Sequence, residues 1–182
     1  LLEGDLAAVI QADPDLLADP ASAAGPLPCA GTCRPELGMA LVRAGRWGLA
    51  ACVLKEALAE GPAALTTARK ADLHAWLGET LSRLGQTADA EVHLREAVRL
   101  APASPLAWLL LGNHALAQGD LDLARAALLN AQRLDPENPA PCLAVAELKA
   151  RAGRYEEVDT WIEAALARAP DDPAIWKAAA RF

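Results

Sequence analysis

The stretch AWLLLGNHALAQGDLDLARAALLNAQRLDPENP, residues 107–139, decides the fold. Two blocks rich in Ala and Leu flank Gln118-Gly119-Asp120, and the second block ends just before Pro136. Apolar and small residues recur three or four positions apart in both blocks, as in helices that bury one face. Glycine suits the end of the first helix, and proline cannot continue the second. The stretch therefore predicts a helical hairpin.

The same pattern recurs with a period of 34 residues, which indicates an array of repeats. In each unit, positions 4, 7, 8 and 11 share one face of a first helix, and positions 20, 24 and 27 share one face of a second. The small residue at position 8 lets the two helices approach, and large residues at positions 4 and 24 fill the remaining space. The predicted units are residues 31–64, 71–104, 105–138 and 139–172, with six additional residues, 65–70, after the first and a fifth unit or capping helix over 173–182.

Two segments precede the array. Residues 1–17 are expected to form an N-terminal helix that either docks on the array or is the tail of an upstream repeat. Residues 18–35 are rich in Pro and are expected to be a linker or insertion. Because the sequence begins without Met and stops inside an expected helix, we expect it to be part of a longer protein.

These features resemble the tetratricopeptide repeat family. The resemblance rests on the 34-residue period, Trp-x-x-Leu-Gly at 108–112, Leu-Gly at 37–38 and 77–78, small residues at positions 20 and 27 of the units, and the closing prolines. It implies an all-α fold, an α-solenoid in which antiparallel helix pairs form a right-handed superhelix. The sequence departs from the family pattern at Arg34, His74 and Cys142, where the family favours Trp, at Lys149, where it favours Tyr, and at Pro35, near the start of a first helix.

Composition argues against several classes of function. The net charge is −7 and no run of Lys or Arg occurs, so no nucleic-acid partner is expected. No stretch reaches the roughly 20 apolar residues of a membrane span, so no membrane insertion is expected of this segment. The compartment stays open, with the cytoplasm favoured over the periplasm. The excess of Arg over Lys, 13 against 4, favours a bacterial origin.

No motif predicts catalysis, a cofactor or a metal site. Cys29 and Cys33 are spaced too widely for a zinc knuckle, and they would form a disulfide only in an exported protein. Cys142 is expected to be a small buried residue. The histidines, His74, His93 and His114, have no nucleophile at helical contact spacing, so they are expected to pack between helices or pair at their edges. Trp108 and Trp176 are expected at core positions.

The family resemblance also implies a binding surface, because first helices line a concave groove in such arrays. Three leucines, Leu109, Leu116 and Leu143, are expected to form an exposed apolar patch there. Asn113 is expected to bind the backbone of a partner. The remaining predicted groove residues are Trp76, an aromatic side chain that would anchor a partner, and four charged residues that would orient it, Glu79, Arg83, Glu147 and Arg151.

The sequence thus predicts a non-enzymatic interaction module that binds a peptide or helix of a partner protein in this groove. Lys is missing from the positions with which some family members grip the terminal carboxylate of chaperones, so a cochaperone of that kind is rejected. Two alternatives stay open. The array could serve self-assembly as a homo-oligomer, or it could be the non-catalytic repeat region of a larger bacterial enzyme or secretion component.

Overall fold

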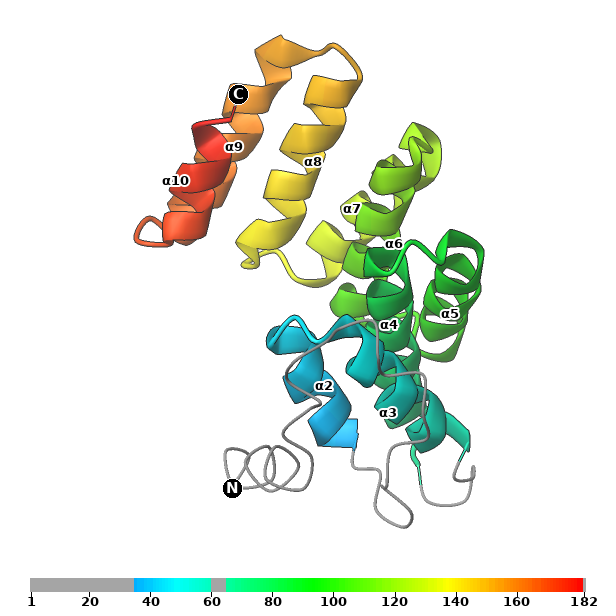
Figure 1. Ribbon diagram of the computed structural model, residues 1–182. Coiled ribbons are helices and arrows are strands. Elements are labelled where there is room, and N and C mark those ends of the chain that lie inside the picture. The colour runs from blue at the N-terminus through cyan, green and yellow to red at the C-terminus, as the bar shows by residue number, and fades with distance from the viewer. Residues whose placement is uncertain (1–34, 60–64, 182) are drawn as a thin grey trace. The chain divides into compact units, whose positions relative to one another are not determined.

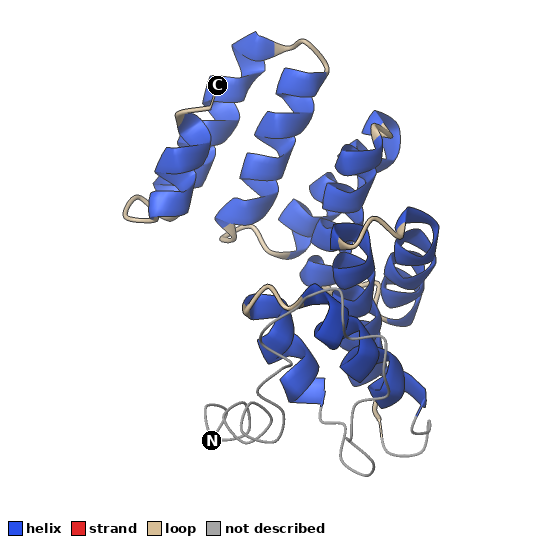
Figure 2. Ribbon diagram, viewed as in Figure 1, coloured by secondary structure: helices blue, strands red, loops and turns tan. Residues whose placement is uncertain are grey.

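A computed structural model describes residues 35–59 and 65–181, and within these ranges every regular element is a helix (Figure 2). The expected N-terminal helix over residues 1–17, and the Pro-rich segment up to its last residue, lie outside the described residues. The chain divides into two compact units, residues 1–100 and 101–182. The fold is an all-α solenoid, as the 34-residue period predicts.

The first unit contains two helical hairpins (Figure 1). Contacts join α2 to α3, α3 to α4 and α4 to α5, and the two first helices, α2 and α4, also touch. The six additional residues 65–70 contain the start of α4, because Thr66 caps this helix by accepting a hydrogen bond from the backbone N–H of Arg69. The helices are α2 (Pro35–Arg43), α3 (Trp47–Ala59), α4 (Thr67–Arg83) and α5 (Thr87–Leu100).

The second unit continues with two hairpins and one further helix. Contacts join α6 to α7, α7 to α8, α8 to α9 and α9 to α10, and the first helices α6 and α8 lie against each other. Helices α6, α8 and α10 each begin at a proline, which suits the first helical position. The elements are α6 (Pro105–Gln118), α7 (Leu121–Leu134), α8 (Pro139–Arg151), a 3-10 turn η2 (Tyr155–Glu157), α9 (Val158–Arg168) and α10 (Pro173–Ala179).

Each hairpin turns at a glycine with a left-handed backbone, as predicted. The φ angles are 71°, 77°, 81° and 72° at Gly45, Gly85, Gly119 and Gly153. At Gly119 the glycine N–H donates to the carbonyl of Leu116, and the following N–H donates to that of Ala115. The other three turns repeat this pair of bonds. Glycine is favoured here because the left-handed turn satisfies carbonyls that the helix end leaves free.

The two helices of a hairpin approach closely at position 8, which is also as predicted. A Cβ placed on Gly112 would lie 2.6 Å from Cδ2 of Leu128, and the nearest atom of the leucine at position 24 would lie 2.5 Å away at Gly38 and 2.6 Å away at Gly78. In the last full hairpin Ala146 occupies position 8, and it packs in one cluster with Val158 and Ile162. The residues at positions 20 and 27, all alanines except Val158, are buried in all four hairpins.

Candidate functional site

The predicted binding surface is best defined in the second unit, where α6 and α8 lie side by side. Arg151 on α8 joins the two helices, because its Nη1 donates a hydrogen bond of 2.7 Å to the carbonyl of Leu116 near the end of α6. We call the residues at the outward positions of this helix pair the first-helix face. Its members are Leu109, Asn113, Leu143, Glu147 and Arg151.

Leu116 does not belong to this face, and the prediction of an apolar patch of three exposed leucines is wrong. Leu116 is only 3% exposed and lies in the core cluster with Ala115, Leu128 and Val145. Its burial has a physical reason, since α8 packs against α6 and covers this position. Leu109 and Leu143 are partly buried, each packed on the edge of a core cluster. The face therefore offers a modest apolar area flanked by polar groups.

Asn113 is the exposed polar residue at the centre of α6. Within the described part of the chain its amide makes no hydrogen bond. The other two asparagines are used internally. Asn130 donates to the carbonyl of Ala126, and Asn138 caps α8. Because asparagine is an unfavourable residue inside a helix, Asn113 lowers the stability of α6 without an internal bond in return.

The charged residues of the first-helix face bind each other. Nη2 of Arg151 lies 2.6 Å from Oε1 of Glu147 one turn earlier, and both side chains are almost half exposed. Arg151 thus stabilises the packing of α8 on α6 by its bond to the Leu116 carbonyl. The pair still presents a carboxylate and a guanidinium to solvent. An exposed pair of this kind contributes little to stability by itself.

The first unit carries the other three predicted groove residues, all on α4. Nε of Arg83 lies 2.8 Å from Oε1 of Glu79, and its guanidinium lies 5.7 Å from the centre of the Trp47 ring. Trp76 is partly buried and packs against the core cluster of this unit. Its backbone carbonyl accepts a 2.7 Å hydrogen bond from the buried hydroxyl of Thr80. Trp76 is therefore held largely by internal packing.

The two tryptophans at position 4 each make the same kind of internal hydrogen bond. The indole N–H of Trp108 donates to the carbonyl of Pro102, and that of Trp176 donates to the carbonyl of Pro170, both at 2.8 Å. The prediction of a core position is wrong for Trp176, which is 57% exposed. Ile175 is the residue of α10 that enters the core instead, where it packs with Cys142 of α8 and Ala165 of α9.

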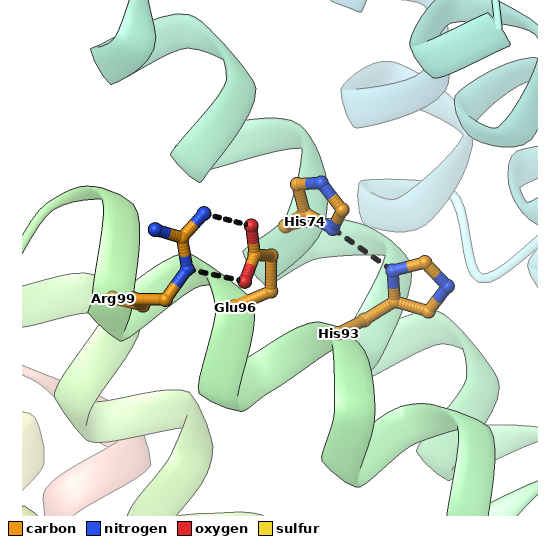
Figure 3. A network of polar contacts seen from close by, with 4 residues as sticks. All are labelled: His74, His93, Glu96 and Arg99. Carbon is orange, nitrogen blue, oxygen red and sulfur yellow. Dashed lines mark hydrogen bonds and ion pairs between the residues drawn. The ribbon is translucent and has the colours of Figure 1, made fainter.

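Two histidines meet between α4 and α5 (Figure 3). Nδ1 of His74 lies 2.9 Å from Nδ1 of His93, and Arg99 binds Glu96 through two hydrogen bonds beside them. Burial, and secondarily the charge of the other ring, lowers the pKa of His74. Burial, and secondarily Lys55, lowers the pKa of His93. The two rings lie between α4 and α5, in agreement with the expectation that the histidines pack between helices, but their contact with each other was not expected.

The cysteines are the remaining candidates for chemistry. Cys142 is fully buried, as expected, and burial raises the pKa of its thiol. Cys52 and Cys142 are both free thiols, whereas Cys29 and Cys33 are outside the described residues. Across residues 35–59 and 65–181 no three His, Cys, Asp or Glu side chains are grouped as metal ligands. In the same ranges no helix is long and apolar enough to span a bilayer.

Two contacts of this site escaped the sequence analysis. The bond from Arg151 to Leu116 joins residues 35 apart, and the His74–His93 contact joins residues 19 apart on different helices. Helical spacing relates residues within one helix only, so it carries no signal for either contact. For the first contact the 34-residue period was the available signal. It places position 13 of one repeat, here Arg151, beside the end of the first helix of the preceding repeat.

Comparison with known proteins gives consistent relatives. A pentatricopeptide repeat-containing protein of Arabidopsis thaliana is 35% identical over 88 residues, which are 47% of this chain and 13% of that protein. A crystal structure of a thermophilic TPR protein of Thermus thermophilus has a TM-score of 0.71 at 24% identity, covering 81% of this chain and 78% of that one. The TPR protein YrrB has a TM-score of 0.64 at 22% identity, covering 81% of this chain and 72% of that one. MamA of Desulfovibrio magneticus RS-1 has a TM-score of 0.62 at 21% identity, covering 78% of this chain and 79% of that one.

At these identities the structural neighbours support the fold alone. Two sequence profiles, each described as tetratricopeptide repeat, match residues 77–139 and 115–182 and together cover more than half of the chain. Arrays of such repeats are interaction scaffolds and are generally non-catalytic. The helical hairpins, their glycine turns and these matches lead to one conclusion: the chain belongs to the tetratricopeptide repeat family, and it is a scaffold for protein partners.

Proposed function

We propose that this protein binds a short segment of a partner protein on the first-helix face of its second unit. Asn113 carries the proposal, because its exposed amide has both a donor and an acceptor and is not used within the described chain. A peptide backbone presents the matching N–H and C=O groups. The proposed role of Asn113 is to bind one peptide unit of the partner.

The neighbouring side chains give this surface further selectivity. Leu109, one helical turn before Asn113 on α6, and Leu143 on α8 supply apolar area, and both are anchored by their core clusters. Rigid anchors of this kind reduce the entropy lost on binding. The Glu147–Arg151 pair lies at the polar rim, where charges orient a partner more than they tighten it. YrrB is a TPR protein with an unusual peptide-binding site, but at 22% identity its site is not transferred to this chain.

The test uses a random peptide display library selected on the whole protein. Peptides recovered from it are measured by fluorescence anisotropy with the wild type, Asn113→Ala and Asn130→Ala. Loss of one hydrogen bond costs about 1 to 1.5 kcal/mol, so Asn113→Ala should weaken binding about tenfold. The matched control, Asn130→Ala, makes the same change on α7 and should leave the affinity unchanged. Equal affinity for Asn113→Ala and the wild type would overturn the proposal.

Light scattering over a range of protein concentrations tests the self-assembly alternative. A receptor for a peptide keeps one mass, whereas an assembling array gains mass with concentration. If mass rises and the library yields no peptide that depends on Asn113, self-assembly replaces peptide binding as the proposed function.

A further inference from the structure

The imidazole rings of His74 and His93 form a contact whose existence depends on their protonation. Nδ1 faces Nδ1 at 2.9 Å, with the ring centres 5.1 Å apart and the planes tilted by 32° (Figure 3). A hydrogen bond at this distance needs a proton on one Nδ1 and a lone pair on the other. When both rings are charged, both Nδ1 atoms carry a proton, so the bond is lost and two positive charges face each other.

The surrounding charges do not relieve this repulsion evenly. Lys55 from α3 acts on His93 and opposes its protonation. From α5, Asp89 favours the charged form of His93, and Glu96 favours the charged form of both rings. Arg99 binds Glu96 through Nε at 2.7 Å and Nη2 at 2.5 Å, which offsets much of that carboxylate's charge. Burial adds the largest contribution and disfavours charge on both rings.

The direction of the pH effect follows from these contributions. Both histidines have folded-state pKa values below the ordinary value of 6.5. The open or unfolded chain therefore binds more protons than the closed chain once the pH falls below about 6.5. The stability that depends on the pair is complete above that pH and is lost progressively below it.

We propose that His74 and His93 form an acid-sensitive contact that holds α4 against α5 in neutral solution and opens this hairpin in mildly acidic solution. At the same position of the third and fourth repeats stand Trp108 and Cys142, of which the indole does not titrate and the thiol is buried. The corresponding residue of the first repeat, Arg34, lies outside the described residues. A protonated pair thus loosens the hairpin that carries Trp76, Glu79 and Arg83.

Amide hydrogen exchange on the whole protein measures the opening directly. Rates are corrected for intrinsic exchange and compared at several pH values between about 7.5 and 5.5, with a chelator present throughout. Opening that takes up protons on both rings should raise its equilibrium constant for α4 and α5 as the pH falls below about 6.5, and uptake of two protons sets a limit of about 100-fold per pH unit. The α8–α9 hairpin contains no histidine and serves as the control within the molecule.

The variants separate the pair from acid sensitivity in general. His74→Phe combined with His93→Leu should remove the extra pH dependence, and His93→Gln should leave at most about 10-fold per pH unit. His114 is retained in every protein, so its contribution cancels in the comparison. An unchanged pH dependence of α4 and α5 in the double variant would overturn the proposal.

A measurement on the wild type keeps the proposal testable if the double variant does not fold. Nitrogen-15 spectra of the histidine side chains near pH 7.5 should show one ring of the pair with its proton on Nδ1. If both rings carry the proton on Nε2, the two Nδ1 lone pairs face each other without a hydrogen bond, and the proposal fails.

Discussion

Replacement of Gly112 by Ala should create strain that a second, specific substitution relieves. The new Cβ would lie 2.6 Å from Cδ2 and 2.7 Å from Cγ of Leu128, so the leucine has to move by roughly 1 Å to reach an ordinary contact. Overpacking of this kind costs about 1 to 3 kcal/mol. Alanine recovers about 1 kcal/mol through its higher helix propensity. The expected net loss in the free energy of unfolding is thus between about 0 and 2 kcal/mol.

The last full hairpin indicates which substitution should compensate. There Ala146 stands in place of the glycine, and it packs with Ile162, which corresponds to Leu128 of the preceding hairpin. Gly112→Ala combined with Leu128→Ile should therefore be more stable than the sum of the two single changes, by about 0.5 kcal/mol or more. Urea denaturation followed by circular dichroism, applied to all four members of this double-mutant cycle, measures the coupling.

Gly119→Ala is the control for the effect of a glycine substitution without packing. Its backbone φ of 81° is unfavourable for alanine, but apart from the adjacent residues no atom lies within 4 Å of the added Cβ. Leu128→Ile should leave the loss at this position unchanged. If Gly112→Ala stabilises the protein by the full propensity gain, or if Leu128→Ile rescues both alanine variants equally, the packing explanation is refuted.

Three further predictions concern the second unit. Leu116→Asp should lower the free energy of unfolding by several kcal/mol because it places a charge in the core, whereas Asn113→Asp at an exposed position should change it by about 0.5 kcal/mol or less, both measured by urea denaturation. Arg151→Ala leaves the Leu116 carbonyl without its bond from α8 and should cost about 1 kcal/mol, while Arg125→Ala, which breaks an exposed pair with Asp122, should cost less. The Cys142 thiol should react with iodoacetamide more slowly than Cys52 near pH 8, as followed by peptide mass spectrometry, because burial shields it and raises its pKa; equal rates would contradict the burial.

Much of the fold could be predicted because its signals are local and periodic. Gly119 ends α6 through bonds to residues within one turn, and Gly112 faces Leu128 within one hairpin. These contacts lie inside the 34-residue unit, so the period reveals them. The start of α4 was missed because Thr66 caps a helix that extends beyond the repeat frame.

The binding face was harder to predict than the fold. Whether Leu116 is exposed depends on how the next hairpin packs on α6, and Arg151 bonds to the same residue from that hairpin. Spacing within one helix does not contain this information. The position-by-position resemblance identified Asn113 as an outward residue, but it treated Leu116 in the same way. The roles of Trp76, Glu79, Arg83, Leu109, Leu143 and Glu147 toward a partner stay predictions.

The matched residues at positions 8 and 24 have a consequence for protein engineering. Each glycine meets a leucine of its own hairpin, as Gly38 does with Leu54, and Ala146 has its own isoleucine. The fit between positions 8 and 24 is therefore a property of each single hairpin and does not depend on its neighbours. Whole hairpins, cut between a closing proline and the start of the next helix, should therefore be exchangeable between such arrays. The exchange has to include both the residue at position 8 and the residue at position 24.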